Sequence, residues 1–181
     1  MRSFVIKEIY ERRKPKFDYG FLWRSILFFV ITLPFRPLAW ISKGYTVIDN
    51  ADWEYLYDDK ILKIERKQVA ANGFDDCIPF YQLSSTDKNL NELIRFKIFG
   101  LFICKTNNGL LLRQFKSPKN WPDSKLIYID LNDYKIENVC SINSSFPEWI
   151  GYKINDNEQI DIIVEQTRDY KKIIRLMANK K

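Results

Sequence analysis

The side chains best suited to chemistry lie around a short charged run, Glu65-Arg66-Lys67. Carboxylates at Asp58, Asp59 and Glu65 could hold Mg²⁺, and Lys67 could steady an attacking water molecule. That arrangement would cleave a phosphodiester bond, provided that the intervening turn brings the carboxylates together. We therefore tested how specific the pattern is.

The Glu65-x-Lys67 spacing resembles the acidic-x-lysine core of restriction-type nucleases, and the resemblance implies a metal-dependent nuclease. The same spacing occurs five times in the chain, at Asp58/Lys60, Glu65/Lys67, Asp123/Lys125, Asp133/Lys135 and Asp169/Lys171. Random order would give roughly two of them. A pattern found at five places marks no single site, so the nuclease is kept only as an alternative.

Other catalytic arrangements lack their residues. The chain has no histidine, and its three cysteines, Cys77, Cys104 and Cys140, form no C-x-x-C pair. The six glycines are too scattered for a phosphate-binding loop. The paired carboxylates Asp58-Asp59 and Asp75-Asp76 stand beside predicted turns, where aspartate bonds its own backbone. We therefore predict a non-enzymatic protein with no cofactor, no bound metal and reduced cysteines in the core.

The chain is long enough for a real core and its charge is unevenly distributed. It has 181 residues, 46% hydrophobic and 29% charged, with a net charge of +6. Residues 1–43 contain nine Lys/Arg and three Asp/Glu, whereas residues 44–181 contain twenty of each. Because the positive and negative charges of residues 44–181 balance, we expect no nucleic-acid partner. We therefore divide the chain into a basic, aromatic segment, 1–43, and a globular domain, 44–181.

The stretch FLWRSILFFVITLPFRPLAWI, residues 21–41, is typical of a membrane-associating segment. As a helix it would extend about 31 Å, with its two tryptophans about 26 Å apart. The residues that we expect to contact lipid are basic or aromatic: Arg12, Arg13, Lys14, Lys16, Trp23, Arg24, Phe28, Phe29, Arg36 and Trp40. Anionic membrane lipid is the partner that this composition predicts.

Three interpretations of this stretch stay open. Arg24 and Arg36 leave only Ser25–Phe35 free of charge, and Pro34 and Pro37 interrupt a helix. An interfacial or re-entrant helix accommodates these residues best. A transmembrane helix is strained but allowed, because arginine can reach the interface. The third interpretation is a helix buried in the protein's own fold or in an oligomer.

The predicted location is the bacterial cytoplasmic membrane. The abundance of Ile, Lys and Asn is typical of AT-rich bacterial or phage genes. The six Lys/Arg before residue 17 would place a spanning N-terminus inside and the domain outside, whereas three unpaired cysteines favour the cytoplasm. An interfacial segment satisfies both observations, so we expect the domain on the cytoplasmic side.

After Gly44 the sequence alternates as short strands between turn residues. We expect strands at 53–57, 61–65, 78–83, 94–99, 101–106, 110–115, 126–131 and 134–142. Asn108-Gly109 predicts a type I′ hairpin between the fifth and sixth of these. Ile160, Ile163, Val164, Tyr170, Ile174 and Met177 recur at helical spacing and predict a C-terminal amphipathic helix, although Ile160–Val164 could begin as a strand.

These elements predict an α+β fold, in which a bent antiparallel sheet or open barrel lies between an N-terminal hydrophobic helix and the C-terminal helix. In element order, ILKIERK, IPFYQL, LFICKTNNGLLLRQF and the final helix resemble a pleckstrin-homology roll. The resemblance implies a scaffold that binds lipid head groups or peptides.

Two tryptophans of the domain are candidate contacts for a protein partner. Trp121 lies in a loop bracketed by Pro118 and Pro122, and Trp149 lies in the segment FPEWIGY. We therefore expect a membrane-associated protein that binds another protein, such as an immunity or exclusion factor. An anionic-lipid-binding module of pleckstrin-homology type is the main alternative.

Overall fold

The chain folds almost entirely as antiparallel β-structure in a computed structural model. The structure describes residues 4–12, 44–58, 62–72, 78–144, 148–154, 159–166 and 170–178, together with residues 23, 24, 27, 30 and 31. Within these ranges the longest helix is α3, Lys88–Ile94, with seven residues. The α+β prediction with two terminal helices is therefore wrong, although the β-rich part of it is confirmed.

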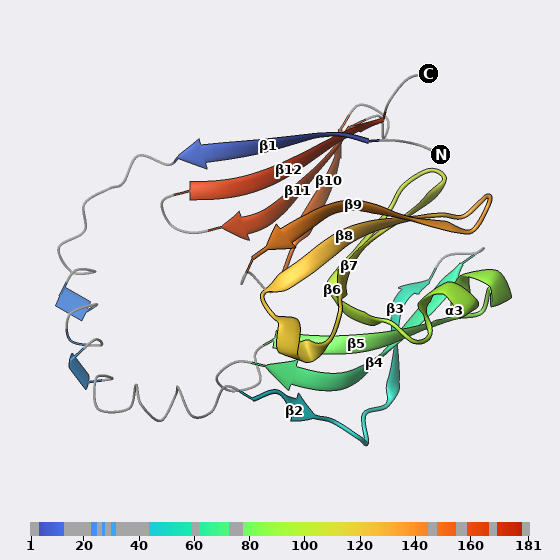
Figure 1. Cartoon of the computed structure of the whole chain (residues 1–181), viewed down its shortest axis with the longest axis horizontal. Coiled ribbons are helices and arrows are strands. Elements are labelled where there is room, and N and C mark those ends of the chain that lie inside the picture. Colours follow the sequence, from blue (N-terminus) through green and yellow to red (C-terminus); the bar gives the residue numbers. More distant parts are fainter. Residues whose placement is uncertain are drawn as a thin grey trace.

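The first and last strands of the chain lie together in a four-stranded sheet, which we call sheet A (Figure 1). Its order is β1 (Phe4–Arg12), β12 (Tyr170–Ala178), β11 (Gln159–Gln166) and β10 (Ile150–Ile154). β1 and β12 pair over nine residues without a shift in register, from Phe4 opposite Ala178 to Arg12 opposite Tyr170. β1 belongs to residues 1–43, so this segment is hydrogen-bonded into the domain.

The remaining strands form sheet B, which bends strongly (Figure 1). Its order is β2 (Thr46–Val47), β4 (Lys63–Asn72), β5 (Ile78–Ser85), β6 (Ile98–Lys105), β7 (Gly109–Phe115), β8 (Asp123–Asp130) and β9 (Lys135–Asn143). β3 (Trp53–Asp58) pairs with the same edge of β4 as β2 does, at the other end of that strand. A 3₁₀ turn, η3 (Pro118–Asn120), connects β7 to β8.

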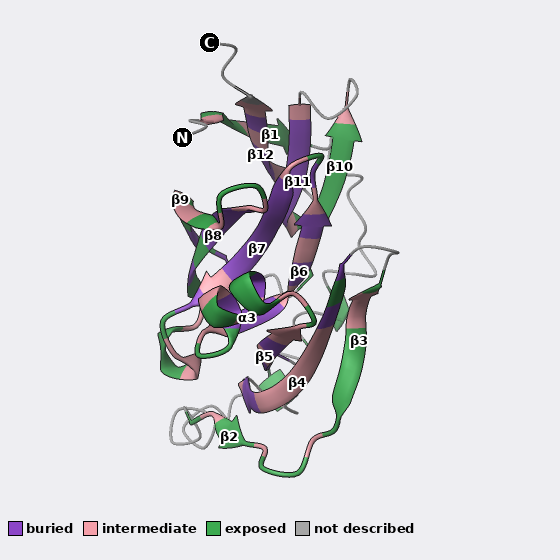
Figure 2. Cartoon of the chain, turned by 90° about the vertical axis from the view of Figure 1, so that its right-hand side faces the viewer, coloured by how far each residue is buried: buried purple, intermediate pink, exposed green. Residues whose placement is uncertain are grey.

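The central strands β7 and β8 are buried on both faces, because sheet B packs against sheet A on one side and bends over itself on the other. Leu111 faces one apolar cluster, whereas its neighbours Leu110 and Leu112 face another. The inter-sheet core lies between sheet A and β6–β9 and includes Phe102, Leu111, Tyr128, Ile142, Ile162 and Ile174. The bend core lies between β4–β5, α3 and β6–β8 and includes Ile64, Leu83, Leu90, Ile94, Leu112 and Ile129. Figure 2 shows β7 and β11 as mostly buried strands, with β3 and β10 exposed.

The short helix α3 replaces the start of a predicted strand. Asp87 caps it, because its Oδ1 accepts a hydrogen bond from the Leu90 amide at 2.9 Å. Leu90 and Ile94, four residues apart, enter the bend core. The strand predicted at 94–99 was therefore wrong before residue 98, where β6 begins and runs continuously to Lys105.

The predicted C-terminal helix is replaced by β11 and β12. Ile160, Ile162 and Val164 alternate along β11, and all three enter the inter-sheet core. β-branched residues pack well on a pleated sheet. The alternation of these residues therefore prevails over the helical spacing of Ile160, Ile163 and Val164. The pleckstrin-homology resemblance depended on that final helix and loses its support.

The predicted hairpin at 101–115 is confirmed, but its turn is not the one we expected. Thr106 donates its amide to the Gly109 carbonyl at 2.8 Å, which leaves Asn107 and Asn108 as the loop. Neither asparagine has a positive φ, and Gly109 lies outside the left-handed region. Gly109 is required for a different reason, because a Cβ there would lie 2.3 Å from the Ile129 carbonyl oxygen.

A bidentate ion pair joins β11 to β12 on the outer face of sheet A. Arg175 donates from Nε and Nη2 to the two carboxylate oxygens of Asp161, at 2.8 and 2.7 Å. These hydrogen bonds hold the pKa of Asp161 below its ordinary value of 3.8. Asp161 is buried in this position, so the pair is not an ordinary surface contact.

We expect Asp161→Asn to lower the free energy of unfolding by about 2 kcal/mol at pH 7. Because the folded-state pKa is depressed, the contribution of the carboxylate is present above the unfolded pKa and is lost as the pH falls through the folded value. Urea unfolding at pH 7 and pH 3 should therefore show a smaller difference from the original protein at pH 3. Asp49→Asn, at an exposed position, is the control, and an equal difference at both pH values would contradict the prediction.

Candidate functional site

The described residues of the hydrophobic N-terminal stretch are helical and exposed. They are Trp23, Arg24, Leu27, Val30 and Ile31. The four apolar side chains are between 58% and 70% exposed. Arg24 follows Trp23 directly, so a basic residue stands beside exposed apolar side chains in this part of the chain. Exposed apolar side chains beside a basic residue are typical of a segment that lies at a membrane interface.

The transmembrane interpretation is not supported. Among the described residues, no helix has both the length and the apolar character needed to cross a bilayer. This finding contradicts the prediction of a transmembrane helix and does not bear on peripheral membrane association.

The structure describes only some of the other residues that were predicted to contact lipid. Arg12 ends β1 and is exposed. Arg13, Lys14, Lys16, Phe28, Phe29, Arg36 and Trp40 lie outside the described residues. The structure therefore places Arg12, Trp23 and Arg24 at the surface, and the remaining contacts stay predictions.

The two tryptophans predicted to bind a partner occupy different environments. Trp149 is only 5% exposed and belongs to the inter-sheet core, where its ring packs against Phe102. A partner could not reach this ring without displacing part of the core. Trp121 is partly buried beside the small cluster that contains Phe80 and Phe115, so a contact through it stays a prediction.

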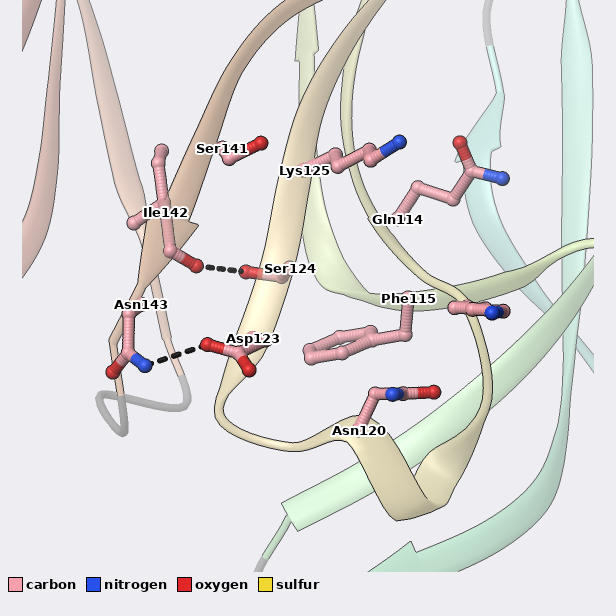
Figure 3. Close-up of a pocket in the computed structure, with 10 residues that line it drawn as sticks. Gln114, Phe115, Asn120, Asp123, Ser124, Lys125, Ser141, Ile142 and Asn143 are labelled. Atoms are coloured by element: carbon pink, nitrogen blue, oxygen red, sulfur yellow. Dashed lines mark hydrogen bonds between the residues drawn. The ribbon is translucent and has the colours of Figure 1, made fainter.

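A groove of about 600 Å³ lies where β7, β8 and β9 meet η3 (Figure 3). Phe115 lies in the middle of the labelled side chains, and polar groups from three strands surround it. They come from the end of β7 and the residue after it, from η3, from the start of β8 and from the end of β9: Gln114, Lys116, Asn120, Asp123, Ser124, Lys125, Ser141 and Asn143. None of them was predicted as a site from the sequence.

Two hydrogen bonds join the strands of the groove. Asn143 donates to the Asp123 carboxylate at 2.5 Å, and Ser124 donates to the Ile142 carbonyl at 3.1 Å. Both bonds join β8 to β9 at the groove wall, as Figure 3 shows. Lys116 and Lys125 give the lining a net positive charge against the single carboxylate. This groove can hold a small polar or anionic molecule, but it presents no nucleophile with a base beside it.

A buried arginine lies behind the groove wall. Arg113 is 1% exposed and donates from Nε to Ser124 Oγ at 3.1 Å and from Nη2 to the Ser144 carbonyl at 2.6 Å. Its guanidinium carbon lies 4.4 Å from the Trp149 ring centroid and 4.8 Å from that of Phe115. Burial lowers the pKa of Arg113 to about 10, so the side chain is still charged at neutral pH.

Arg113 joins the groove to the core. Ser124 accepts from the guanidinium and donates to β9, and Ser144 is the last described residue after β9. The position of β9, and with it one wall of the groove, therefore depends on this charge. A charged residue inside the apolar run GLLLRQF was the sequence signal for this arrangement.

The residues of the nuclease alternative are engaged in the β3–β4 hairpin. Asp58 forms an ion pair with Lys63 at 3.4 Å, and Glu65 lies opposite Tyr55 in the register. Asp59 lies outside the described residues. In the described part of the chain, no three His, Cys, Asp or Glu side chains are grouped so that they could hold a metal ion.

The described cysteines are free thiols. Cys104 is buried in the inter-sheet core, as predicted, and Cys140 is partly buried beside it. Burial raises the pKa of both thiols, that of Cys140 to about 11. Both therefore stay protonated and weakly nucleophilic at neutral pH. Cys77 lies outside the described residues.

Comparison with known proteins identifies no relative. No protein-family model, no curated protein and no solved structure matches this chain.

Proposed function

We propose that this chain is a non-enzymatic, peripheral membrane protein, whose N-terminal segment binds anionic lipid and thereby holds the β-domain at the cytoplasmic membrane, where it binds another protein. An immunity or exclusion factor is one class of protein with this organisation. The proposal rests on one observation, the exposed apolar side chains of Trp23, Leu27, Val30 and Ile31.

Two further observations support a lipid surface as the ligand. The whole net charge of +6 lies within residues 1–43, which favours an anionic surface. Residues 13–43 of this segment are also joined to the fold at both ends, because β1 precedes them and β2 follows them in the chain. Lipid bound there would therefore hold sheet A and sheet B close to the membrane.

The first experiment tests whether these apolar side chains bind lipid. It compares binding to vesicles of neutral phosphatidylcholine with binding to vesicles containing about 30% phosphatidylglycerol. We expect flotation of the full chain with anionic vesicles, and a loss of about a hundredfold in affinity for Trp23→Ser/Leu27→Ser, because two large side chains no longer enter the interface. Val47→Ser/Trp53→Ser removes two exposed apolar side chains from β2 and β3 and should bind normally.

The charge dependence supplies the outcome that would refute the proposal. Raising the salt concentration should weaken vesicle binding, and Arg13→Ala/Lys14→Ala/Lys16→Ala should weaken it about a hundredfold at low salt. Equal binding to neutral and anionic vesicles, or binding that the serine pair leaves unchanged, would show that this segment is not a lipid contact.

A further inference from the structure

β1 presents the longest regular free strand edge of the described sheets. Within the part of the chain that the structure describes, its only neighbour is β12. It pairs with β12 over nine residues without a bulge, and its sequence FVIKEIYER contains no proline or glycine. β10 has five residues, and β3 and β9 pair with register shifts. A long, straight edge has a row of unpaired amide and carbonyl groups, ready to pair with another strand.

The charges along β1 are complementary to those of a second, antiparallel β1. Lys7 and Glu11 are both exposed and lie on the same face of the strand, on either side of Ile9. Neither forms an ion pair with another described residue. A two-fold axis through Ile9, normal to the sheet, would place each Lys7 opposite the Glu11 of the other copy. Opposite charges in directly facing positions stabilise a strand pair.

The alternative registers are less favourable. A two-fold axis normal to the sheet leaves the outer face of both copies on the same side. Two facing residues must therefore point to the same face, so the axis can pass only through a residue of β1 and not between two residues. Centring on Glu8 would bring two carboxylates together, and centring on Lys7 would bring two ammonium groups together. Centring on Tyr10 would leave only five residues paired, from Glu8 to Arg12. The register about Ile9 pairs residues 6 to 12 and opposes no like charges.

The outer face of sheet A gives an independent reason for the same register. Ile9, Ile173, Ile163 and Ile150 stand opposite one another in successive strands and form one row across the sheet. Pairing centred on Ile9 would continue this row into the second copy, through Ile9 beside its counterpart. The apolar row would then extend across eight strands without interruption.

We propose that two copies of this chain associate edge to edge through β1, antiparallel and centred on Ile9, to form one continuous eight-stranded sheet from two copies of sheet A. This inference does not depend on lipid binding by the N-terminal segment.

Charge exchange at Lys7 and Glu11 tests the partner and the register. We expect sedimentation equilibrium of the full chain to show twice the chain mass of 21.7 kDa. Lys7→Glu and Glu11→Lys should each raise the dissociation constant about tenfold or more, because each creates two like-charge contacts across the axis. The double exchange restores opposite charges and should return the constant to within about threefold of the original. Lys125→Glu, at an exposed position on β8, is the control.

A cysteine at the two-fold axis tests the geometry without relying on charge. Facing Cα atoms of paired strands lie about 4.5–5.5 Å apart, which is within disulfide range. Ile9→Cys should therefore form a covalent dimer under mild oxidation, whereas Val5→Cys, on the same face but far from the axis, should behave like the original chain. A monomer at about 100 µM, a dimer that Lys7→Glu leaves intact, or an Ile9→Cys variant that does not cross-link would each overturn the proposal.

Discussion

Replacing Arg113 with methionine is expected to lower the free energy of unfolding by about 3 kcal/mol. Methionine fills much of the same volume, but it removes the donors to Ser124 and to the Ser144 carbonyl. Both acceptors lie in residues that are themselves buried, so no water would readily replace the guanidinium. The contacts of the charge with the rings of Trp149 and Phe115 would also be lost.

Urea unfolding followed by tryptophan fluorescence measures this loss. Arg95→Met is the matched control, because Arg95 is exposed and contacts only the outward ring of Phe96 among the described side chains. We expect it to cost less than about 0.5 kcal/mol. If Arg113→Met costs no more than Arg95→Met, the buried charge is not a structural link between β7 and β9.

Replacing Gly109 with alanine is expected to cost about 3 kcal/mol, because the added methyl group has no room. Its Cβ would lie 2.3 Å from the Ile129 carbonyl oxygen and 2.5 Å from ring carbons of Tyr128. Neither neighbour can move easily, since Ile129 lies in the bend core and Tyr128 in the inter-sheet core. The strain would therefore separate β7 from β8, two strands that contribute to both cores.

Gly44→Ala is the control for this substitution. A Cβ at Gly44 would meet no heavy atom within 4 Å, so the same change there should leave the midpoint of urea unfolding within about 0.5 kcal/mol of the original. A small cost for Gly109→Ala would mean that β7 and β8 are spaced more widely than the structure shows.

The parts of the fold that were predicted correctly are those with local signals. Trp53–Tyr57 and Ile61–Glu65 surround a turn of charged residues, and the hairpin of β6 and β7 surrounds two asparagines. In both cases the partner strand is adjacent in the sequence, so alternation and turn composition suffice. Most boundaries shifted by one or two residues, but β4 runs to Asn72, well beyond the predicted end at Glu65.

The elements that were missed depend on distant partners or on competing patterns. β1 has no partner nearer than β12, at the other end of the chain. The isoleucines of β11 and β12 satisfy both a helical and an alternating spacing, and only packing against Phe102 and Tyr128 selects the strand. α3 has a clear capping residue in Asp87, but its apolar face consists of two side chains.

Lipid contact by residues 21–41 stays a prediction, which came from the apolar and basic composition of that stretch. The groove beside η3 was invisible, because its lining comes from the ends of three strands with no shared motif. Trp149 was selected by residue type alone, and a large ring is as useful in a core as at an interface.

The pairing of β1 with β12 has a consequence for biosynthesis. Residues 4 to 178 must all leave the ribosome before Phe4 can meet Ala178. Until then the isoleucine-rich segments of sheet A are translated without a finished sheet to join, and closure over such a long loop is slow. Translation that stops before β12 would therefore leave β1 without its partner strand, and the unpaired edge would make the product a substrate for chaperones and proteases.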